Sequence, residues 1–340
     1  MPRQLHFRAP TKPCIFKLLS VFALVAGLGS DSDALADAPA MQVANRRLFA
    51  DSSCKLPPAP SGGAAEMRAV TNVARHLGGE PWVAEANVVG SGDVYQFGVA
   101  AGASLVNVLS KAYAHMLGTR IWGFDSFDGV PAEPMNEATA WKPGVYRQKD
   151  PEGLMKHLMQ RLAQHQQTVK FIRGLYSTSL SADLACKLKM RPASYIDIDC
   201  DIYTGAIQAL DWAFAHGVAQ VGTVIGYDDW MVMPCSTGTT DVWQFGESKA
   251  HFNITHKYRV RFECLSGPCH DTPEGTLFCR GIPNRDCWRP YFRVVELGAT
   301  VPDTGYNTTQ AQLHRFIEDK SNPRCAGAGQ KNPVTGLVVT

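Results

Sequence analysis

The sequence predicts an α/β fold in which helices cover both faces of a mostly parallel β-sheet. Between residues 94 and 225, short apolar segments alternate with segments of helical periodicity, which is the pattern of a parallel sheet with helical crossovers. The 340 residues are 45% hydrophobic and 19% charged, as expected for a folded globular chain. The 33 basic and 31 acidic residues nearly balance, which argues against a protein that binds nucleic acid.

Each element of this fold has its own signal in the sequence. Residues 57–63 are rich in proline and glycine and indicate a linker, and residues 64–77 then place Met67, Val70 and Val73 on one face of a helix. The alternation that follows predicts strands at residues 94–97, 120–124, 168–172, 194–198 and 221–225, and helices at residues 104–117, 155–167, 181–189 and 205–216. A closing pair of strands is expected at residues 258–262 and 291–296, around a cysteine-bearing insertion.

The first 36 residues are expected to address the protein to a compartment. Residues 1–17 contain four basic residues and no acidic one, an apolar run follows at residues 18–29, and small residues stand at 34–36. This three-part pattern is typical of a secretory signal peptide, and the run is shorter than the roughly 20 residues of a bilayer span. An uncleaved membrane anchor and an organelle presequence are the alternatives. We therefore predict a lumenal or secreted protein that contacts a membrane only through this segment.

The cysteines point to the same compartment. Ten are present, and four of them lie between residues 264 and 287, a density that fits a disulfide-stabilised loop in an oxidising environment. A zinc site is the alternative, but the spacings are wider than the usual CxxC pairs. Cys200 is expected to remain a free, buried thiol. Sequons at Asn253 and Asn307 agree with a glycoprotein, although such short motifs often arise by chance.

A glycine-containing turn joins the first predicted strand to its helix. Gly98 and Gly102 let the backbone approach a ligand closely, and the helix that begins at Ser104 offers free N–H groups. Val99 stands between the two glycines, so the turn lacks the pattern that binds a pyrophosphate. An ordinary tight turn without a ligand is the alternative.

An acidic residue, Asp125, follows the second predicted strand, 23 residues beyond Gly102. An acid at this place can accept hydrogen bonds from the ribose hydroxyls of a nucleoside. Capping of the following turn is the alternative role.

The most specific signal is a concentration of acids after two later strands. Asp199 and Asp201 are two residues apart at the end of one strand, and Asp228 and Asp229 follow the next. Residues i and i+2 of a strand point to the same side, and neighbouring strands bring such acids to one edge of the sheet, where ligands bind. Carboxylates packed so closely repel one another unless a cation lies among them, and oxygen ligands favour a hard ion such as Mg²⁺. Solvated loop acids and helix caps are the alternative.

Six motifs in order now resemble one known family. They lie at residues 94–102, 123–131, 141–144, 174–176, 198–203 and 228–230. Together they resemble the macrocin O-methyltransferase family, class I enzymes that use S-adenosylmethionine and Mg²⁺ to methylate sugar hydroxyls. The resemblance implies a Rossmann-like fold with a seven-stranded sheet. It also implies a methyltransferase domain at residues 91–300. The Cys-rich insertion at 264–290 within it is not a feature of the family. The sequence itself indicates an N-terminal linker and helical segment at 37–90 and a C-terminal tail at 301–340.

The resemblance assigns a role to each candidate site residue. Gly98 and Gly102 would contact the methionine part of the cofactor, Asp125 its ribose, and Gly174 would lie near the adenine. Further cofactor-binding residues on this interpretation are Val99, Ser104 and Ser126. The expected metal ligands are Asp199, Asp228 and Asp229, and the expected general base is Asp201.

The chemistry that follows from the resemblance is methyl transfer to a hydroxyl group. A sugar hydroxyl is too weak an acid to ionise at neutral pH, so a metal that binds it would lower its pKa while Asp201 removes the proton. The expected partner is a small-molecule or glycan acceptor, and a homo-oligomer is left open. A lumenal glycosyltransferase remains an alternative, because Asp199 and Asp201 also form an Asp-x-Asp motif. A catalytically inactive binding protein on the same fold is the third reading.

Overall fold

The computed structural model describes residues 54–63, 65, 66, 68–70, 73, 89–114, 116, 118–134, 137, 139–163, 168–267, 269 and 289–318. All of them belong to one compact unit, Leu48–Thr340. The predicted address at residues 1–36 lies outside the described residues, as does the whole segment 270–288, which contains Cys279 and Cys287. Within the described part of the chain, no helix is long and apolar enough to cross a membrane.

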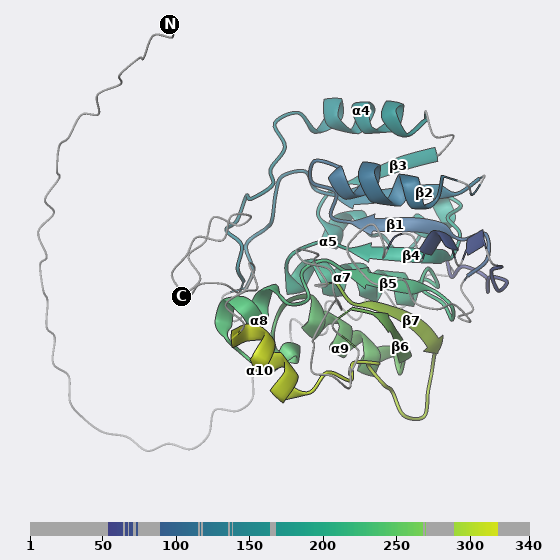
Figure 1. Cartoon of the computed structure of the whole chain (residues 1–340). Coiled ribbons are helices and arrows are strands. Elements are labelled where there is room, and N and C mark those ends of the chain that lie inside the picture. Colours follow the sequence, from purple (N-terminus) through teal and green to yellow (C-terminus); the bar gives the residue numbers. More distant parts are fainter. Residues whose placement is uncertain are drawn as a thin grey trace, which may run out of the picture. The chain divides into compact units, whose positions relative to one another are not determined.

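A seven-stranded sheet forms the centre of this unit. Its strands are β1 (Asp93–Phe97), β2 (Arg120–Asp125), β3 (Thr168–Arg173), β4 (Ala193–Ile198), β5 (Val224–Tyr227), β6 (Arg261–Ser266) and β7 (Tyr291–Glu296). They lie side by side in the order β3-β2-β1-β4-β5-β7-β6 (Figure 1). The pairs among β1 to β5 are parallel, and β7 runs antiparallel to both β5 and β6. The predicted mostly parallel sheet with a closing pair of strands is confirmed.

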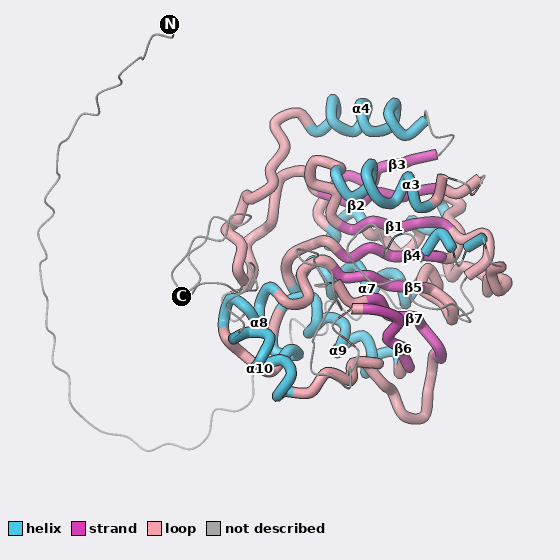
Figure 2. The backbone as a smooth tube through the Cα atoms, in the orientation of Figure 1, coloured by secondary structure: helices cyan, strands magenta, loops and turns pink. Residues whose placement is uncertain are grey.

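Helices cover both faces of the sheet (Figure 2). One face packs against η1 (Leu105–Leu109), α3 (Ser110–Ala112) and α4 (Pro151–Ala163). The other packs against α6 (Leu184–Lys187), α7 (Tyr203–Ala215), α8 (Val232–Thr237) and α9 (Gly246–Tyr258), with α5 (Tyr176–Ser179), η2 (Val242–Gln244) and α10 (Gln310–Glu318) completing the element order. Successive residues of a strand serve opposite faces: Val94 packs in the first layer, whereas Tyr95 and Phe97 pack in the second.

The structure differs from the sequence prediction in several bounds: the strand expected at residues 221–225 is Val224–Tyr227, and the helix expected at 181–189 is Leu184–Lys187. A larger difference lies around α9. The strand expected at residues 258–262 begins at Arg261, because α9 continues to Tyr258 and ends at Arg259 in a left-handed conformation. Helix α9 was not expected from the sequence, since its buried side includes polar residues such as Glu247, Ser248 and His251. Apolar periodicity, which reveals most helices, is therefore weak in this segment.

Disulfides hold two peripheral segments to the sheet. Cys54 pairs with Cys186, which ties the N-terminal segment to α6, and Cys264 pairs with Cys269 at the end of β6. Cys235 is also disulfide-bonded, and Cys200 is the free cysteine of the described residues. The predicted disulfide loop is confirmed, and the zinc alternative fails for Cys264 and Cys269 because their sulfurs are bonded to each other.

The two sequons occupy different environments. Asn253 lies inside α9, where its side-chain amide donates a hydrogen bond to the hydroxyl of Tyr203 at 2.9 Å. Asn307 is exposed in the loop before α10. The loop position suits glycan attachment better than the helical one.

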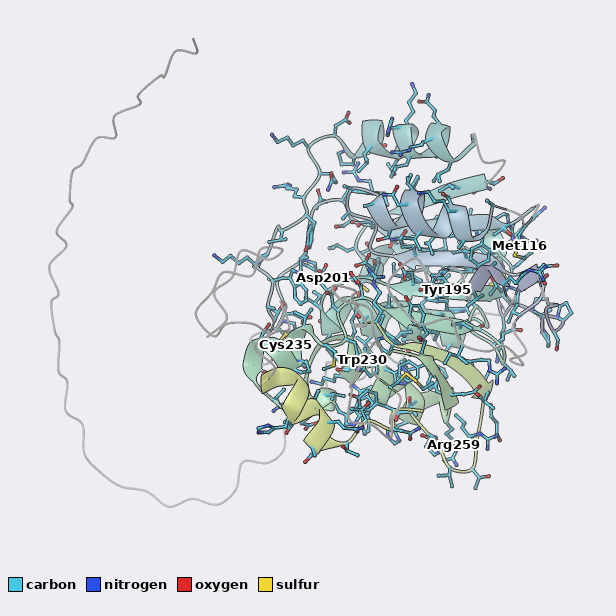
Figure 3. The ribbon with its side chains drawn as sticks, in the orientation of Figure 1. Met116, Tyr195, Asp201, Trp230, Cys235 and Arg259 are labelled. Carbon is cyan, nitrogen blue, oxygen red and sulfur yellow. A yellow bond between two sulfur atoms is a disulfide. The ribbon has the colours of Figure 1, made fainter. Side chains whose placement is uncertain are left out.

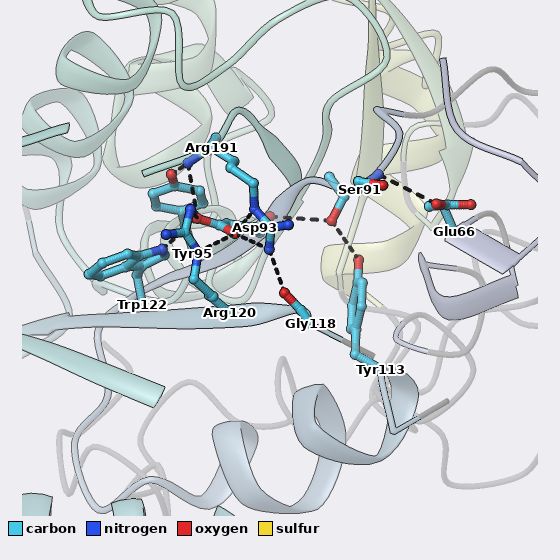
Figure 4. A network of polar contacts seen from close by, with 10 residues as sticks. Glu66, Ser91, Asp93, Tyr95, Tyr113, Gly118, Arg120, Trp122 and Arg191 are labelled. Carbon is cyan, nitrogen blue, oxygen red and sulfur yellow. Dashed lines mark hydrogen bonds and ion pairs between the residues drawn. The ribbon is translucent and has the colours of Figure 1, made fainter. Parts of the chain in front are cut away.

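The amino end of the sheet is braced by a network around Asp93 (Figure 4). This carboxylate is fully buried and accepts hydrogen bonds from the indole of Trp122 at 2.8 Å and from the backbone of Arg191 at 3.0 Å. The guanidinium groups of Arg120 and Arg191 each pair with it at 2.7 Å. Arg191 also donates to the carbonyl of Gly118. The network connects β1 and β2 to the turn before β4.

Candidate active site

The candidate site residues all lie in loops that follow the carboxyl ends of the parallel strands. Gly98 follows β1, Asp125 ends β2, Gly174 follows β3, Asp199 follows β4 and Asp228 follows β5. Parallel pairing brings these five positions to one edge of the sheet. Asp201 lies at this edge and Met116 at the opposite one (Figure 3).

The turn after β1 touches the acidic loop after β4. Gly98 has a φ of +90°, and a Cβ at this position would lie 1.7 Å from the carbonyl oxygen of Asp199. The backbone N–H of Asp199 also donates to the carbonyl of Phe97 at 2.9 Å. Only glycine fits at position 98, because a side chain would collide with the backbone of the acidic loop. The predicted cofactor turn and the predicted metal loop are therefore in direct contact.

Asp125 organises the turn after β1. One carboxylate oxygen accepts hydrogen bonds from the N–H groups of Val99 and Ala100, both at 2.8 Å, and the other accepts from Phe127 at 2.6 Å. Its backbone carbonyl accepts from the N–H of Gly174 at 3.0 Å. The turn-capping role considered for Asp125 is thus present in the structure. Each carboxylate oxygen has more than one acceptor position, so this role and a ribose contact are compatible.

The remaining candidate cofactor residues surround the same turn. Ser104 immediately precedes η1, and its side chain makes no capping hydrogen bond. The hydroxyl of Ser126 accepts from the backbone of Asp128 at 3.1 Å. Gly102, with a φ of +78°, packs against Leu158 of α4. These residues form a loop whose backbone conformation is set by glycine and by Asp125.

Asp199, Asp228 and Asp229 form a group that could hold a metal ion. One carboxylate oxygen from each lies within 4.8 Å of the others, and all three side chains keep partial exposure. The backbone fixes their positions, since Ile198 and Tyr227 are paired in register and the N–H of Asp228 donates to the carbonyl of Ile198 at 2.9 Å. Burial, together with the charge of Asp228, raises the pKa of Asp199 and of Asp229 well above the usual value. Three oxygen donors this close fit a small hard cation.

Asp201 lies beside this group in an unusual backbone conformation. Strand β4 ends at Ile198, so Asp201 reaches the group from a loop and not by strand alternation as the sequence suggested. Its φ is +67°, which Asp tolerates better than most residues. Burial, with added repulsion from Asp228 and Asp125, raises the pKa of Asp201 to about 8. A carboxylate with a pKa in this range is suited to accept a proton near neutral pH.

Comparison with known proteins decides the family. The family model for macrocin-O-methyltransferase (TylF) matches residues 81–252, which is half of the chain. The chain belongs to the macrocin O-methyltransferase family. It is therefore an O-methyltransferase, as its sequence motifs predicted. The matched residues include β1 to β5 and every candidate site residue.

Solved structures similar to this family member are distant. The calicheamicin methyltransferase CalS11 is 19% identical, with 59% of this chain and 72% of that chain covered and a TM-score of 0.39. The O-methyltransferase NovP is 12% identical, with 68% of this chain and 78% of that chain covered and a TM-score of 0.38. Likenesses this remote do not bear on the substrate. A search of curated proteins finds no match.

Two residues of this macrocin O-methyltransferase family member join the site without having been expected there. Glu247 is 1% exposed at the start of α9, and its carboxylate accepts from the backbone of Asp229 at 2.9 Å and of Cys200 at 3.4 Å. It thereby connects the two acidic loops. Burial raises the pKa of Glu247 well above the usual value. Its sequence signal was weak, since an acid in the first turn of a helix is common.

The second unexpected residue is Arg289. Its guanidinium pairs with Asp228, and its other end lies 3.8 Å from the buried carboxylate of Asp197. Arg289 lies beyond the matched residues, at the end of the Cys-rich insertion. Nothing in the local sequence relates it to the acids, because the contact depends on how β7 returns to the sheet beside β5.

A loop segment between β2 and α4 lies near the acids. Glu133 accepts hydrogen bonds from the backbone N–H and hydroxyl of Thr204, at 2.9 and 2.8 Å. Glu137 pairs with Lys249 of α9 at 2.7 Å. Burial raises the pKa of Tyr146 to about 12, with a further contribution from the charge of Asp201. This segment is thus fixed to α7 and α9, and it carries an aromatic residue close to the acidic group.

Proposed function

We propose that the chain transfers a methyl group from S-adenosylmethionine to a hydroxyl of a sugar or of a glycosylated small molecule, with Mg²⁺ held by Asp199, Asp228 and Asp229 and with Asp201 as general base. The observation that carries this proposal is the direct contact between the turn after β1 and the acidic loop after β4. A methyl donor on that turn and a cation among the acids would then be neighbours.

The turn after β1 fits a methyl donor. Gly98 keeps a side chain out of the space beside the acidic loop, and the backbone N–H groups of Val99 and Ala100 are held by Asp125. Gly102, Ser104, Ser126 and Gly174 border the same edge of the sheet. The chain's contribution is a fixed backbone loop with an acid suited to ribose hydroxyls.

The acidic group fits a divalent cation. Three carboxylates with converging oxygens carry more negative charge than their single arginine partner balances. Burial, and then the charge of Asp228, raises the pKa values of Asp199 and Asp229, and a bound cation would favour their ionised forms. S-adenosylmethionine supplies an activated methyl group, and Mg²⁺ supplies a positive charge that makes a hydroxyl more acidic.

Within this arrangement the chain's own residues position the acceptor and move its proton. Asp201 accepts the hydroxyl proton, since its carboxylate lies beside the expected metal ligands Asp228 and Asp229. Glu247 holds the two acidic loops together through their backbone N–H groups. Tyr146 and the segment around it lie close enough to contact the acceptor.

We also propose that the protein works in an oxidising compartment. Its two described disulfides and the exposed sequon at Asn307 support a secretory location. Expression of the full chain with a C-terminal tag, followed by mass analysis of its N-terminus, would test cleavage after Ala36. An intact N-terminus on a membrane-bound protein would favour the anchor instead.

Calorimetry tests the enzyme class most simply. The full-length protein is titrated with S-adenosylmethionine and, separately, with UDP-sugars, each with and without Mg²⁺. Binding of S-adenosylmethionine supports the proposal, and labelled methyl transfer to a panel of sugar acceptors would then define the substrate. Binding of UDP-sugars alone would overturn it in favour of the glycosyltransferase reading of the Asp199 and Asp201 motif.

A further inference from the structure

The acidic group is accompanied by one arginine that the family match does not include. Arg289 is largely buried, with 12% of its side chain exposed, and its Nη2 pairs with Asp228. Among the described residues, every ion pair made by the acids of this site involves Arg289. The acids concerned are Asp197, Asp199, Asp201, Asp228, Asp229 and Glu247. One guanidinium therefore stands against several carboxylates.

A second position for the guanidinium exists beside the first. Asp197 is fully buried on β4, its Oδ1 accepts from the hydroxyl of Tyr195 at 2.8 Å, and its Oδ2 has no hydrogen-bond partner among the residues that the structure describes. Nη1 of Arg289 is also buried without a hydrogen bond, and it lies 3.8 Å from Oδ1 of Asp197. The ion pair between Nη1 of Arg289 and Oδ1 of Asp197 is too long for a hydrogen bond, and it can shorten with a small movement of the guanidinium.

The backbone of Arg289 is fixed, so such a movement would be confined to the side chain. A Cβ on Gly267 would lie 2.1 Å from the carbonyl oxygen of Arg289, so the backbones of these two segments are in tight contact. The carbonyl of the next residue, Pro290, accepts from the N–H of Tyr227 at 3.2 Å. Gly267 itself lies within the loop closed by Cys264 and Cys269. The loop closed by the Cys264–Cys269 disulfide thus fixes the backbone of Arg289 beside the acidic group.

We propose that Arg289 is the resident counter-charge of the acidic group, that a divalent cation displaces it from Asp228, and that its guanidinium then moves from its present long ion pair with Asp197 into a hydrogen bond with that carboxylate. This inference rests on the proposed cation site. It assigns a function to the end of the Cys-rich insertion, which sets how tightly the cation binds. A cation that must displace an arginine binds more weakly than one that enters an open group of carboxylates.

Binding of Mn²⁺, followed by electron paramagnetic resonance, tests this competition. Arg289→Met should bind Mn²⁺ at least about ten-fold more tightly than the unaltered protein. In the unaltered protein the cation must overcome the attraction between Arg289 and Asp228, and this attraction is absent from the variant. Arg289→Lys keeps the competing charge and should bind with nearly unaltered affinity. Arg293→Met is the matched control, since Arg293 lies four residues further along, on β7, and pairs with Glu263.

A second variant tests the same competition by altering Asp197. Asp197→Asn removes the position that receives the displaced guanidinium, so Mn²⁺ should bind several-fold more weakly than to the unaltered protein. This variant keeps the hydrogen bond to Tyr195 available, so it tests the proposal even if Arg289→Met does not fold.

The outcomes separate this inference from the metal site itself. Equal or weaker Mn²⁺ binding by Arg289→Met, with clear binding by the unaltered protein, would overturn the counter-charge role and leave the cation site standing. Failure of both proteins to bind Mn²⁺ would overturn both. Tighter binding by Arg289→Met, unaltered binding by Arg293→Met and weaker binding by Asp197→Asn would together establish the role.

Discussion

The two ends of the sheet each bury negative charge, but they differ in how that charge is compensated by arginine. At the amino end, Asp93 is fully buried and is paired with Arg120 and Arg191, with the indole of Trp122 and a backbone N–H completing its contacts (Figure 4). At the carboxyl end, two acids, Asp197 and Asp228, share Arg289. A buried charge is costly unless it is paired, so Asp93 has the contacts expected of a structural residue.

The incomplete pairing at the carboxyl end therefore needs another explanation. Burial raises the pKa of Asp199, Asp201 and Asp229, which means that the folded chain holds these acids in an unfavourable state. Perturbed groups of this kind gather at functional sites. The comparison teaches that charge compensation, more than burial, distinguishes a structural acid from a functional one in this molecule.

The largest expected effect comes from Asp201. Asp201→Asn should lower the rate of methyl transfer by a factor of about 10² to 10⁴, because the general base is lost while the fold and the turn after β1 remain. The measurement is labelled methyl transfer to an identified acceptor, with S-adenosylmethionine binding followed in parallel. Asp211→Asn, an acid on α7 that pairs with Lys257, is the control. Turnover by Asp201→Asn at the unaltered rate would remove the base assignment.

A change at the other end of the sheet should affect stability instead. Asp93→Asn removes the charged partner of Arg120 and Arg191, whose side chains are 23% and 37% exposed, and should therefore cost about 1–3 kcal/mol of the free energy of unfolding. Denaturant unfolding followed by circular dichroism measures this loss. Mn²⁺ affinity of the folded variant should be unchanged. A variant that is as stable as the unaltered protein would show that the Asp93 network is dispensable.

Two glycines with positive φ, one at each end of the sheet, differ in the space around them. Gly98→Ala would place a methyl group against the backbone of Asp199, whereas Gly118→Ala at the amino end meets nothing within 4 Å. Both have positive φ, so Gly118→Ala should cost about 1–2 kcal/mol for the conformation alone. Gly98→Ala should cost more and should also weaken S-adenosylmethionine and Mn²⁺ binding together. Loss of only one ligand would argue against contact between the two sites.

A buried group without any charged partner provides a third case. His251 lies between the hydroxyl of Tyr227 at 2.8 Å and the carbonyl of Thr304 at 3.0 Å, and burial lowers its pKa to about 3. The unfolded chain takes up a proton below about pH 6.5, whereas the folded chain does not until about pH 3. Stability should therefore fall as the pH drops through this window, by about 1.4 kcal/mol per pH unit from this group.

His251→Gln should flatten that part of the stability curve. Unfolding by denaturant at several pH values between 3 and 7 measures the slope for the two proteins. Equal slopes would mean that His251 does not stay neutral in the folded protein.

The fold could be predicted from the sequence because most of its strands and helices carry regular apolar patterns. The acids at Asp199 and Asp228 could also be predicted to meet, since each follows a strand and parallel neighbours end at one edge. Strand alternation predicts Asp201 at the same edge. In the structure β4 ends at Ile198, so Asp201 reaches that edge from the loop after the strand.

What the sequence did not reveal depends on contacts between distant segments. Helix α9 turns polar side chains toward the core, so its pattern is not that of an amphipathic helix, and Glu247 was overlooked with it. Arg289 reaches Asp228 only because β7 inserts between β5 and β6. Residues 301–318 were interpreted as part of a tail, but the backbone of Asp303 exchanges hydrogen bonds with the segment at the start of β6.

The central claim is that the acids at the carboxyl end hold a divalent cation. Calorimetric titration with Mg²⁺ at pH 7, in buffers of different ionisation enthalpy, tests it most directly. We predict one Mg²⁺ per chain with release of protons, because a cation would ionise carboxylates whose pKa values are raised without it. Asp229→Asn should lose this binding, and Asp211→Asn should keep it. No binding of Mg²⁺, or equal binding by Asp229→Asn, would contradict the account.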